Sequence, residues 1–571
     1  MEVSKILTAG SHVSCVVFAG SDVCTELEIK KLYLLTNPKP VMRKLFVLGS
    51  IAVVAIILAL SWFWIDALFL FLIAGPLIYM GIADMLQVKQ SIKRNFPLFG
   101  RLRYVFEDLR PKIQQYFVES DTDGAPINRN ERSVIYQRAK KQIDTIPFGT
   151  QLNVYAEGYE WITHSIAPKD FHKMEHNPRI RFGGKDCKQP YEMSVLNVSA
   201  MSFGSLSQNA ILALNSGAKL GGFAHNTGEG GLSPYHLQPG GDIIWQIGTG
   251  YFGARTEDGN FSDEAFKANA TKPNVRMIEI KLSQGAKPGH GGILPAAKNT
   301  PEIAKIRLVK PGTTVFSPPF HSAFSTPKEL LMFVKRLRDL SGGKPVGFKL
   351  CVGRKSEFLS ICKAMVELKI YPDFITVDGG EGGTGAAPPE FTNFVGMPLL
   401  DALAFVDNAL RGFSIRQEMR MIASGKVLTG FNILRAMALG ADTCNAARAM
   451  MMALGCIQAL ECNRNTCPTG VATQNPELMK GLDVKDKAQR VANFHKNTVE
   501  SFVELMAATG MTHPEQINRT HVYRRVFMNM VKTYEEIYPT IPDGCLLEGG
   551  DVPFELEEYM KYASAESFEL A

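Results

Sequence analysis

The chain has 571 residues, of which 46% are hydrophobic and 21% are charged, a composition typical of a globular enzyme with a large core. The net charge of +6 is spread thinly and includes no run of lysines and arginines, so the sequence lacks the basic tract of a nucleic-acid-binding protein. Ten cysteines are too few for a disulfide-rich secreted scaffold, and clustered thiols in a reducing compartment bind metal more often than they pair.

Residues 1–41 show no clear periodicity, and we expect a poorly defined N-terminal tail there. Met42 directly precedes a long apolar run, which makes it an alternative start of the chain.

Two apolar runs follow, at residues 45–64 and 67–86, and each is long enough to span a bilayer as a helix. A secretory signal is the alternative for the first run, but neither a polar loop nor a small-residue cleavage site separates it from the second. We therefore predict a transmembrane helical hairpin over residues 42–88 in the cell inner membrane. Basic residues on both flanks place its two ends in the cytoplasm; they are Arg43, Lys44, Lys89, Lys93, Arg94, Arg101 and Arg103.

Residues 89–190 are polar and rich in aromatic residues and short charged stretches. They predict an irregular α+β collar of amphipathic helices and connecting strands, without a catalytic motif. At the other end of the chain, we expect residues 501–571 to form a helical extension.

Between residues 191 and 500, short apolar runs alternate with polar or glycine-rich loops and helical stretches. Repeated βα units predict a parallel sheet, and eight units at this length predict a closed (β/α)8 TIM barrel. A doubly wound sheet is the alternative. The eight predicted strands lie in SVLNVSAMSFGSLS, GGFAHNTGEGG, VRMIEIKLSQGAKPGHGG, TTVFSPPFHS, KPVGFKLCVG, DFITVDGGEGGTGAAP, MRMIASGKV and DTCNAARAM.

The strand ends of such a barrel carry its active site. A glycine-rich loop, Val377–Pro388, follows the sixth predicted strand, and its backbone N–H groups could cradle a phosphate or a flavin; a mobile surface loop is the alternative. Barrels commonly bind phosphate at the next two strand ends, which are Ala423–Lys426 and Asn445–Ala449 here. Arg448 could bind a phosphate there through two of its N–H groups. Gly248–Gly253 matches the dinucleotide pattern GxGxxG, but no helix-opening apolar run follows, so we interpret the match as chance.

A further loop after a predicted strand contains Lys281, Gln284 and Lys287. Lysines in this position can hold a substrate carboxylate, whereas the alternative is a solvated loop. Glu229 lies between glycines at another strand end and is a candidate acid, base or ammonium ligand, with a structural salt bridge as the alternative. Three histidines on similar loops lack metal-ligand spacing and are expected to be solvated or packed: His225, His290 and His321.

Cys456, Cys462 and Cys467 fall within twelve residues, and Pro468 directly follows the last of them. Their spacing does not match the paired knuckles of zinc sites, and three is an odd number for disulfides. Cysteine followed by proline is a known ending of iron–sulfur motifs. Because no cysteine stands close after Cys467, the pattern favours a three-iron cluster.

Five segments strongly resemble the FMN-binding synthase domain of glutamate synthase, and the resemblance covers about residues 145–500; they are SAMSFGSLS, NTGEGG, IEIKLSQGAKPGHGG, GGEGGTGAAP and LGCIQALECNRNTCPTGVATQNPEL. In that family the domain is a (β/α)8 barrel that holds FMN and a [3Fe-4S] cluster. It condenses 2-oxoglutarate with ammonia and reduces the 2-iminoglutarate to L-glutamate. The hairpin resembles that of short, membrane-anchored bacterial members.

The resemblance implies an FMN-binding barrel with an iron–sulfur loop over residues 191–500. It assigns the three cysteines to the cluster, places Glu229 near the amine, and turns Lys281, Gln284 and Lys287 toward the substrate. With the strand-end loops above, the predicted FMN contacts are Ser199, Ala200, Met201, Ser202, Lys349, Asp378, Gly379, Gly380, Gly382, Gly383, Thr384, Gly385, Ser424, Gly425, Lys426, Ala447 and Arg448.

The chain departs from the family pattern in three places. The seventh strand ends in ASGK instead of Asp-Gly-Gly, and the eighth in CNAARA instead of a segment rich in glycine and phenylalanine. The chain opens on a tail and a hairpin instead of a glutaminase domain, so we expect no glutamine hydrolysis.

These features together predict a membrane-anchored, glutamate synthase-like oxidoreductase acting on CH-NH2 donors, with its catalytic domain on the cytoplasmic side. Its electrons would come from ferredoxin, a quinone or a reductase subunit. Two alternatives stay open: a related FMN and iron–sulfur enzyme with a different amine or keto acid, and a membrane-bound electron-transfer subunit without turnover of its own.

Overall fold

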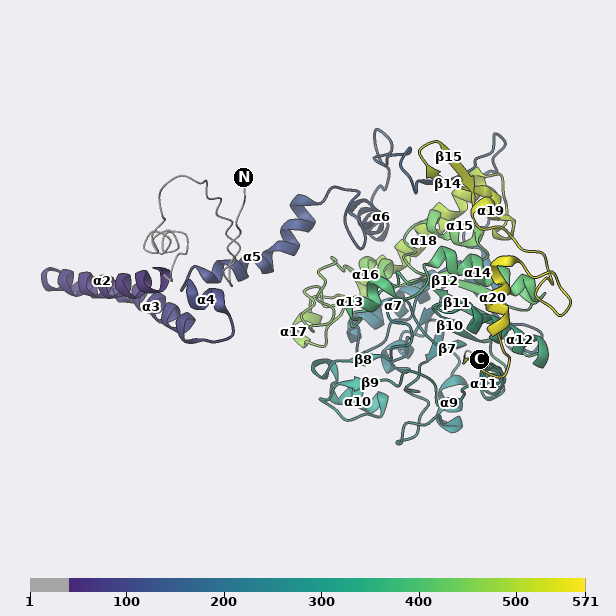
Figure 1. The fold of residues 1–571 in the computed structure, drawn as a ribbon, viewed down its shortest axis with the longest axis horizontal. Helices are drawn as coiled ribbons and strands as arrows, with labels where there is room; N and C mark the ends of the chain where they lie inside the picture. Colours follow the sequence, from purple (N-terminus) through teal and green to yellow (C-terminus); the bar gives the residue numbers. More distant parts are fainter. Residues whose placement is uncertain (1–40, 570–571) are drawn as a thin grey trace, which may run out of the picture. The chain divides into compact units, whose positions relative to one another are not determined.

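The computed structural model describes residues 41–569, so the tail predicted over residues 1–41 lies, but for its last residue, outside the described part. The described residues form two compact units that divide between Val118 and Glu119, inside the segment expected as a collar (Figure 1).

The first unit is helical and contains the two apolar helices expected from the sequence. By length and composition, Met42–Phe63 and Ile65–Leu86 are long enough and apolar enough to cross a membrane, with mean hydropathies of 2.6 and 2.1. Its elements are α2 (Val41–Phe63), η1 (Ile65–Leu70), α3 (Phe71–Leu86), α4 (Ser91–Asn95), α5 (Gly100–Ile113) and the π-helical turn η2 (Gln114–Val118).

The second unit is built around a closed barrel of eight parallel strands, which confirms the predicted fold class. The strands follow the order β10-β11-β12-β13-β4-β5-β6-β7 around the barrel. Several read as unbroken apolar runs because parallel strands are buried on both faces. They are β4 (Leu196–Val198), β5 (His225–Asn226), β6 (Ile243–Ile247), β7 (Val275–Lys281), β10 (Val346–Leu350), β11 (Phe374–Asp378), β12 (Arg420–Ser424) and β13 (Thr443–Ala446).

One of the eight predicted strands was wrong. The segment TTVFSPPFHS contains β9 (Val315–Phe316), which pairs antiparallel with β8 (Ile293–Leu294) outside the barrel. The third barrel strand is β6, which pairs with β5 and β7 and which the sequence analysis missed. Its loop carries the discounted GxGxxG match, and no helix begins there before Asp263. Residues 282–345 are therefore a long excursion between neighbouring strands.

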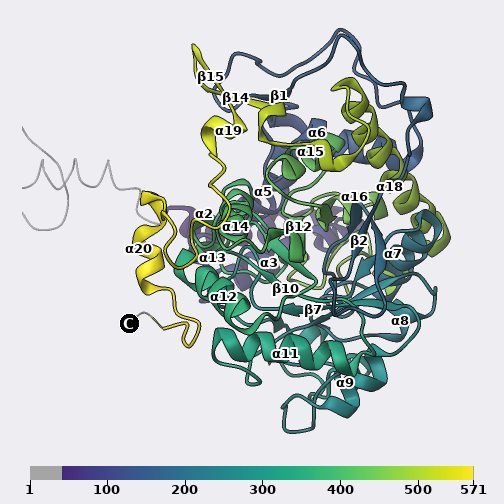
Figure 2. The same ribbon diagram turned by 90° about the vertical axis from the view of Figure 1, so that its right-hand side faces the viewer.

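Helices surround the strands, as Figure 1 and Figure 2 show for α11, α12 and α14. α11 begins at a capping box in which Thr326 and Glu329 satisfy each other's backbone N–H groups, and its buried face packs on β10. The principal helices are α7 (Gln208–Gly221), α8 (Pro234–Leu237), α9 (Asp263–Ala270), α10 (Pro301–Arg307), α11 (Pro327–Leu340), α12 (Lys355–Leu368), α13 (Pro389–Phe394), α14 (Leu399–Gly412), α15 (Gly430–Ala438), α16 (Arg448–Leu454), α17 (Pro476–Met479) and α18 (Val484–Ala508).

The C-terminal segment, expected to be helical, also contains a β-hairpin. Strands β14 (Val522–Phe527) and β15 (Met530–Thr533) form a three-stranded sheet with β1 (Glu160–Ile162), as Figure 2 shows. The unit also contains α6 (Arg129–Lys140) before the barrel strands and α19 (Tyr534–Ile537) and α20 (Phe554–Tyr562) after them. The antiparallel pair β2 (Arg179–Phe182) and β3 (Tyr191–Ser194) leads into the barrel.

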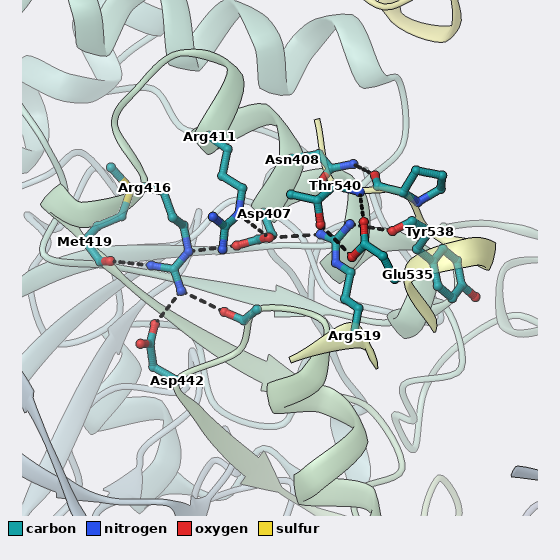
Figure 3. A network of polar contacts seen from close by, with 12 residues as sticks. Asp407, Asn408, Arg411, Arg416, Met419, Asp442, Arg519, Glu535, Tyr538 and Thr540 are labelled. Carbon is teal, nitrogen blue, oxygen red and sulfur yellow. Dashed lines mark hydrogen bonds and ion pairs between the residues drawn. The ribbon is translucent and has the colours of Figure 1, made fainter. Parts of the chain in front are cut away.

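A buried ionic network connects the C-terminal segment to the barrel helices (Figure 3). Asp407 on α14 accepts hydrogen bonds from Arg411, Arg416 and Arg519 at 2.8–2.9 Å. Arg519 comes from the C-terminal segment and also donates to the carbonyl of Tyr538 at 2.6 Å. Asp407 thus links the barrel to its C-terminal extension.

Candidate functional site

The carboxyl ends of the barrel strands surround a cavity of about 1140 Å³. A smaller hollow shares Gln284, Lys426 and Arg448 with it, so the two form one continuous site. Every residue predicted for the site lines the cavity or the hollow except Lys281 and Gly379.

Lys281 lies just behind the wall, at the end of β7, where its ammonium forms an ion pair with Glu229. Lys281 Nζ lies 2.8 Å from Glu229 Oε2, and both side chains are largely buried. Burial alone would raise the pKa of Glu229, but Lys281, Lys287 and Arg307 together hold it below its ordinary value. Glu229 is therefore an ionised carboxylate within a group of cations.

Two glycines make room for Glu229. A Cβ at Gly292 would lie 2.5 Å from Glu229 Oε1, and a Cβ at Gly248 would lie 2.7 Å from its Cβ. Gly248 belongs to the GxGxxG segment, so this motif serves the site through close packing.

Arg307 at the end of α10 is a site residue that the sequence analysis missed. It is 5% exposed and lines the cavity, and its Nη2 donates to the carbonyl of Phe203 at 3.1 Å. Burial lowers the pKa of Arg307 to about 10, which leaves the guanidinium charged at neutral pH. The residue comes from the excursion after β7 and follows no strand end, so no pattern in the sequence indicated it.

The hollow at the ends of β10 to β13 is the predicted flavin site. Lys349 Nζ and Asp378 Oδ1 lie 3.2 Å apart in its wall, and Asp378 also accepts the N–H of Gly285 at 2.7 Å. Asn445 Oδ1 is buried there without a hydrogen-bond partner. An unpartnered acceptor beside cationic Lys349 and Arg448 suits a ligand that carries both hydroxyl and phosphate groups.

The glycine-rich loop contributes to this site in a different way than expected. The N–H groups of Gly379, Gly380 and Gly382 already donate to carbonyls of the protein at 2.7–2.8 Å, so they do not form the expected cradle. Gly383 instead allows the guanidinium of Arg448 to approach, because a Cβ there would lie 3.2 Å from Arg448 Cζ. Arg448 Nη2 donates to the carbonyl of Glu381 at 2.6 Å.

The three clustered cysteines are free and line the large cavity together. Burial raises the pKa of Cys456 to about 11. Burial also acts to raise the pKa of Cys467, but the Thr469 hydroxyl and nearby backbone N–H groups bring it below its ordinary value. Hydrogen bonds to sulfur of this kind accompany iron–sulfur ligands.

Within residues 41–569, no three His, Cys, Asp or Glu side chains gather closely enough to hold a single metal ion. A cluster of several irons and sulfides is larger than one ion, so its ligands stand farther apart. Three free thiols around one cavity therefore fit such a cluster in their chemistry.

Lys298 is a second residue that the sequence analysis missed. Its ammonium is buried and donates to the carbonyls of Ser205, Cys462 and Ala472 at 2.8–3.1 Å. Lys298 thereby fastens the cysteine loop to the loop after β4 and places a positive charge beside Cys462 and Cys467.

Of the three histidines expected to be solvated or packed, His225 and His321 are buried and His290 is half-buried. His321 Nδ1 lies 3.1 Å from Tyr251 Oη, and its Nε2 lies 2.9 Å from the carbonyl of Lys281. Tyr251 accepts the N–H of Ala323 and so donates to Nδ1, which leaves the ring proton on Nε2 to bind the Lys281 carbonyl. His321 therefore supports the end of β7.

The chain is similar to a family of known proteins over most of its length. The family model described as the conserved region in glutamate synthase matches residues 146–512. The glutamate synthase large subunit-like protein YerD of Bacillus subtilis (strain 168) is 39% identical over 509 residues, covering 82% of this chain and 96% of that protein. The archaeal glutamate synthase [NADPH] of Methanocaldococcus jannaschii is 38% identical over 323 residues, covering 56% of this chain and 60% of that protein. A solved structure of mutant flavocytochrome b2 with pyruvate bound has a TM-score of 0.40 at 13% identity, over 73% of this chain and 85% of that one.

Proposed function

Because the chain belongs to the glutamate synthase family of oxidoreductases, we propose that it reduces 2-iminoglutarate, formed from 2-oxoglutarate and ammonia, to L-glutamate. Condensation of the keto acid with ammonia releases one water, and the imine then takes up two electrons and two protons.

The charge of the cavity is the observation that carries this proposal. At Glu229, the three cations Lys281, Lys287 and Arg307 surround one carboxylate, which leaves this part of the cavity wall with an excess of two positive charges. A keto diacid carries two negative charges at neutral pH, so the pocket and 2-oxoglutarate match in charge. Gln284 lines the same wall and offers an amide for orientation.

In this proposal Glu229 binds the nitrogen of the ammonia and of the imine. As an ionised carboxylate it holds ammonium or the iminium N–H, and it accepts a proton as ammonia attacks the keto carbon. The ion pair with Lys281 keeps the carboxylate in place, and Lys287 and Arg307 hold the carboxylates of the substrate.

Two cofactors would complete this chemistry. FMN fits the hollow lined by Ser199, Lys349, Asn445 and Arg448, and the three cysteines suit a [3Fe-4S] cluster beside it. Bound there, the cluster would pass single electrons to the flavin, and the flavin would supply hydride. The electron donor would be ferredoxin, a quinone or a reductase subunit.

The two apolar helices of the first unit would anchor the protein in the inner membrane with the barrel in the cytoplasm. Their length and composition support this, together with basic residues on both flanks.

The test is an anaerobic assay of the purified full-length protein, reduced with dithionite, with ammonium and 2-oxoglutarate as substrates. We expect L-glutamate by chromatography, together with flavin absorption bands and bound iron in the same sample. A sample with both cofactors but no glutamate would exclude this substrate pair, and a sample with neither would exclude the redox function.

A further inference from the structure

Helix α5 in the first unit carries an apolar stripe that stays exposed. Leu102, Val105, Phe106, Leu109 and Ile113 follow the spacing of a single helix face, and each is between 39% and 61% exposed. At 3.6 residues per turn they fill an arc of about 100°. An apolar face of this width is normally covered by other protein or by lipid.

The charged residues of α5 are sorted relative to this stripe. By the same helical geometry, Arg110 lies about 40° from one edge of the stripe, and Lys112 and Arg101 lie about 20° and 40° from the other. Arg103 and Asp108 each lie about 60° from an edge, and Glu107 lies on the polar face, where its carboxylate pairs with Arg103 at 3.0 Å. Basic side chains at the edges can bury their stems along apolar surface and keep their charges at the level of lipid phosphates.

An ion pair ties α5 to the end of the second candidate span. Asp84, near the end of α3, is 2% exposed and binds Arg101 through both of its oxygens at 2.8 Å. The same carboxylate accepts the N–H of Leu98 at 3.2 Å. α5 therefore starts at the level where α3 ends, which is the headgroup layer if α3 crosses a bilayer.

We infer that α5 lies in the headgroup layer of the bilayer crossed by α2 and α3 and binds anionic phospholipid there, an inference that rests on the proposed membrane anchoring. The lipid fits on two counts. Acyl chains cover the apolar stripe, and anionic headgroups pair with Arg110 and Lys112 at its edges. Seven Lys and Arg residues but only two acidic residues lie between positions 89 and 113, which favours an anionic surface; the basic residues are Lys89, Lys93, Arg94, Arg101, Arg103, Arg110 and Lys112.

Tryptophan fluorescence of the full-length protein in nanodiscs tests the depth of α5. The discs contain phosphatidylglycerol and a phosphatidylcholine brominated near the headgroup, which quenches nearby indoles. Phe106→Trp places the probe in the stripe, and Tyr104→Trp places it about 150° from the centre of the stripe, on the polar face, as the matched control. We expect the bromolipid to remove most of the fluorescence added by Phe106→Trp and to leave that added by Tyr104→Trp.

The native Trp62 and Trp64 separate this inference from the anchoring on which it rests. If they are quenched and the indole added at position 106 is not, the anchoring stands and the inference is wrong. If they are not quenched either, the anchoring itself fails. An unquenched probe at position 106 in a stable dimer would show that a second copy covers the stripe instead of lipid.

Hydrogen exchange tests the choice of lipid. We expect amides of residues 100–113 to exchange more slowly in discs with phosphatidylglycerol than in discs of phosphatidylcholine alone. The double variant Arg110→Gln/Lys112→Gln should lose this difference, whereas Asp108→Asn should keep it. Equal exchange of the unaltered protein in both discs would exclude anionic phospholipid as the partner.

Discussion

Glu229 faces three cationic side chains, and its charge decides what the cavity can bind. The Glu229 side chain lies between Gly248 and Gly292, where the absence of a Cβ allows its carboxylate to reach Lys281 without a clash. The sequence indicated Glu229, Lys281 and Lys287 because all follow strand ends. Arg307 and Lys298 gave no such signal, because they lie on helical turns of the excursion after β7.

Glu229→Gln should lower kcat for glutamate formation about 100-fold or more, because the amide keeps the shape of the side chain but can neither accept the proton nor balance Lys281. Steady-state assay of the reduced protein measures this effect, and the flavin spectrum should stay unchanged. Glu302→Gln, at an exposed position on α10, is the control with full activity. A loss of less than threefold at Glu229 would remove it from the mechanism.

Lys298→Met should cost about 3 kcal/mol of unfolding free energy, because three buried carbonyls lose their donor at once. We also expect a lower iron content, since the carbonyl of Cys462 is one of the three. Urea denaturation and metal analysis measure both, and Lys305→Met, at an exposed position on α10, is the control. Unchanged iron with reduced stability would show that Lys298 supports the fold without shaping the cysteine loop.

At the scale of elements, the count of eight strands was right although one member was wrong. β6 contains the buried run IIWQI, but the segment is followed by a GxGxxG match and does not stand out as a strand, whereas the short run at Val315–Phe316 predicts a strand that lies outside the barrel. Both segments are β-branched runs next to glycine or proline, and only the pairing of β6 with β5 and β7 distinguishes them. Local pattern predicts strands, whereas membership of the barrel depends on contacts distant in sequence.

The network at Asp407 makes a prediction about how helices are joined (Figure 3). Asp407→Asn should destabilise the protein by about 3–5 kcal/mol, because Arg411, Arg416 and Arg519 lose a buried counter-charge. The melting temperature measures the loss, and Asp401→Asn, at an exposed position of the same helix, should have little effect. Proteolysis should cut first after about residue 519, where the extension is released. An unchanged melting temperature would contradict a role for this carboxylate in joining the two segments.

At the scale of the whole molecule, four buried histidines are distributed over the second unit. His225 lies in β5, His236 in α8, His321 in the excursion and His495 in α18. Burial lowers the pKa of His236 and His321 to about 4 and that of His495 to about 3, and it lowers the pKa of His225 well below the ordinary value. All four are therefore neutral in the folded protein at neutral pH, and this dispersion makes the barrel as a whole sensitive to acid.

The folded protein should lose stability as the pH falls from about 6.5 toward 4. In this window the unfolded chain takes up a proton at each histidine and the folded chain does not, so stability rises with pH there. The slope grows from about half its full value at pH 6.5 to about 1.4 kcal/mol per pH unit for each histidine near pH 5.5, where four contribute about 5 kcal/mol per pH unit. A decline this steep exhausts a typical stability of about 5–15 kcal/mol within a few pH units, so we expect acid unfolding near pH 5, before most carboxylates titrate.

His495→Gln isolates one of these protons. His495 Nε2 lies 2.9 Å from Ser194 Oγ, and the ring stacks on Phe223 with centroids 3.9 Å apart, so an amide can replace the hydrogen bond but cannot be protonated. Free energies of unfolding from urea denaturation between pH 7 and 5 should show a slope shallower by about 1 kcal/mol per pH unit, whatever the variant loses at pH 7. His172→Gln, at an exposed position, should leave the slope unchanged. If the stability of the unaltered protein stays level from pH 6.5 to 5, these rings are not buried in the neutral form. Rings that stay unprotonated in the folded protein must make stability fall as the unfolded chain takes up protons.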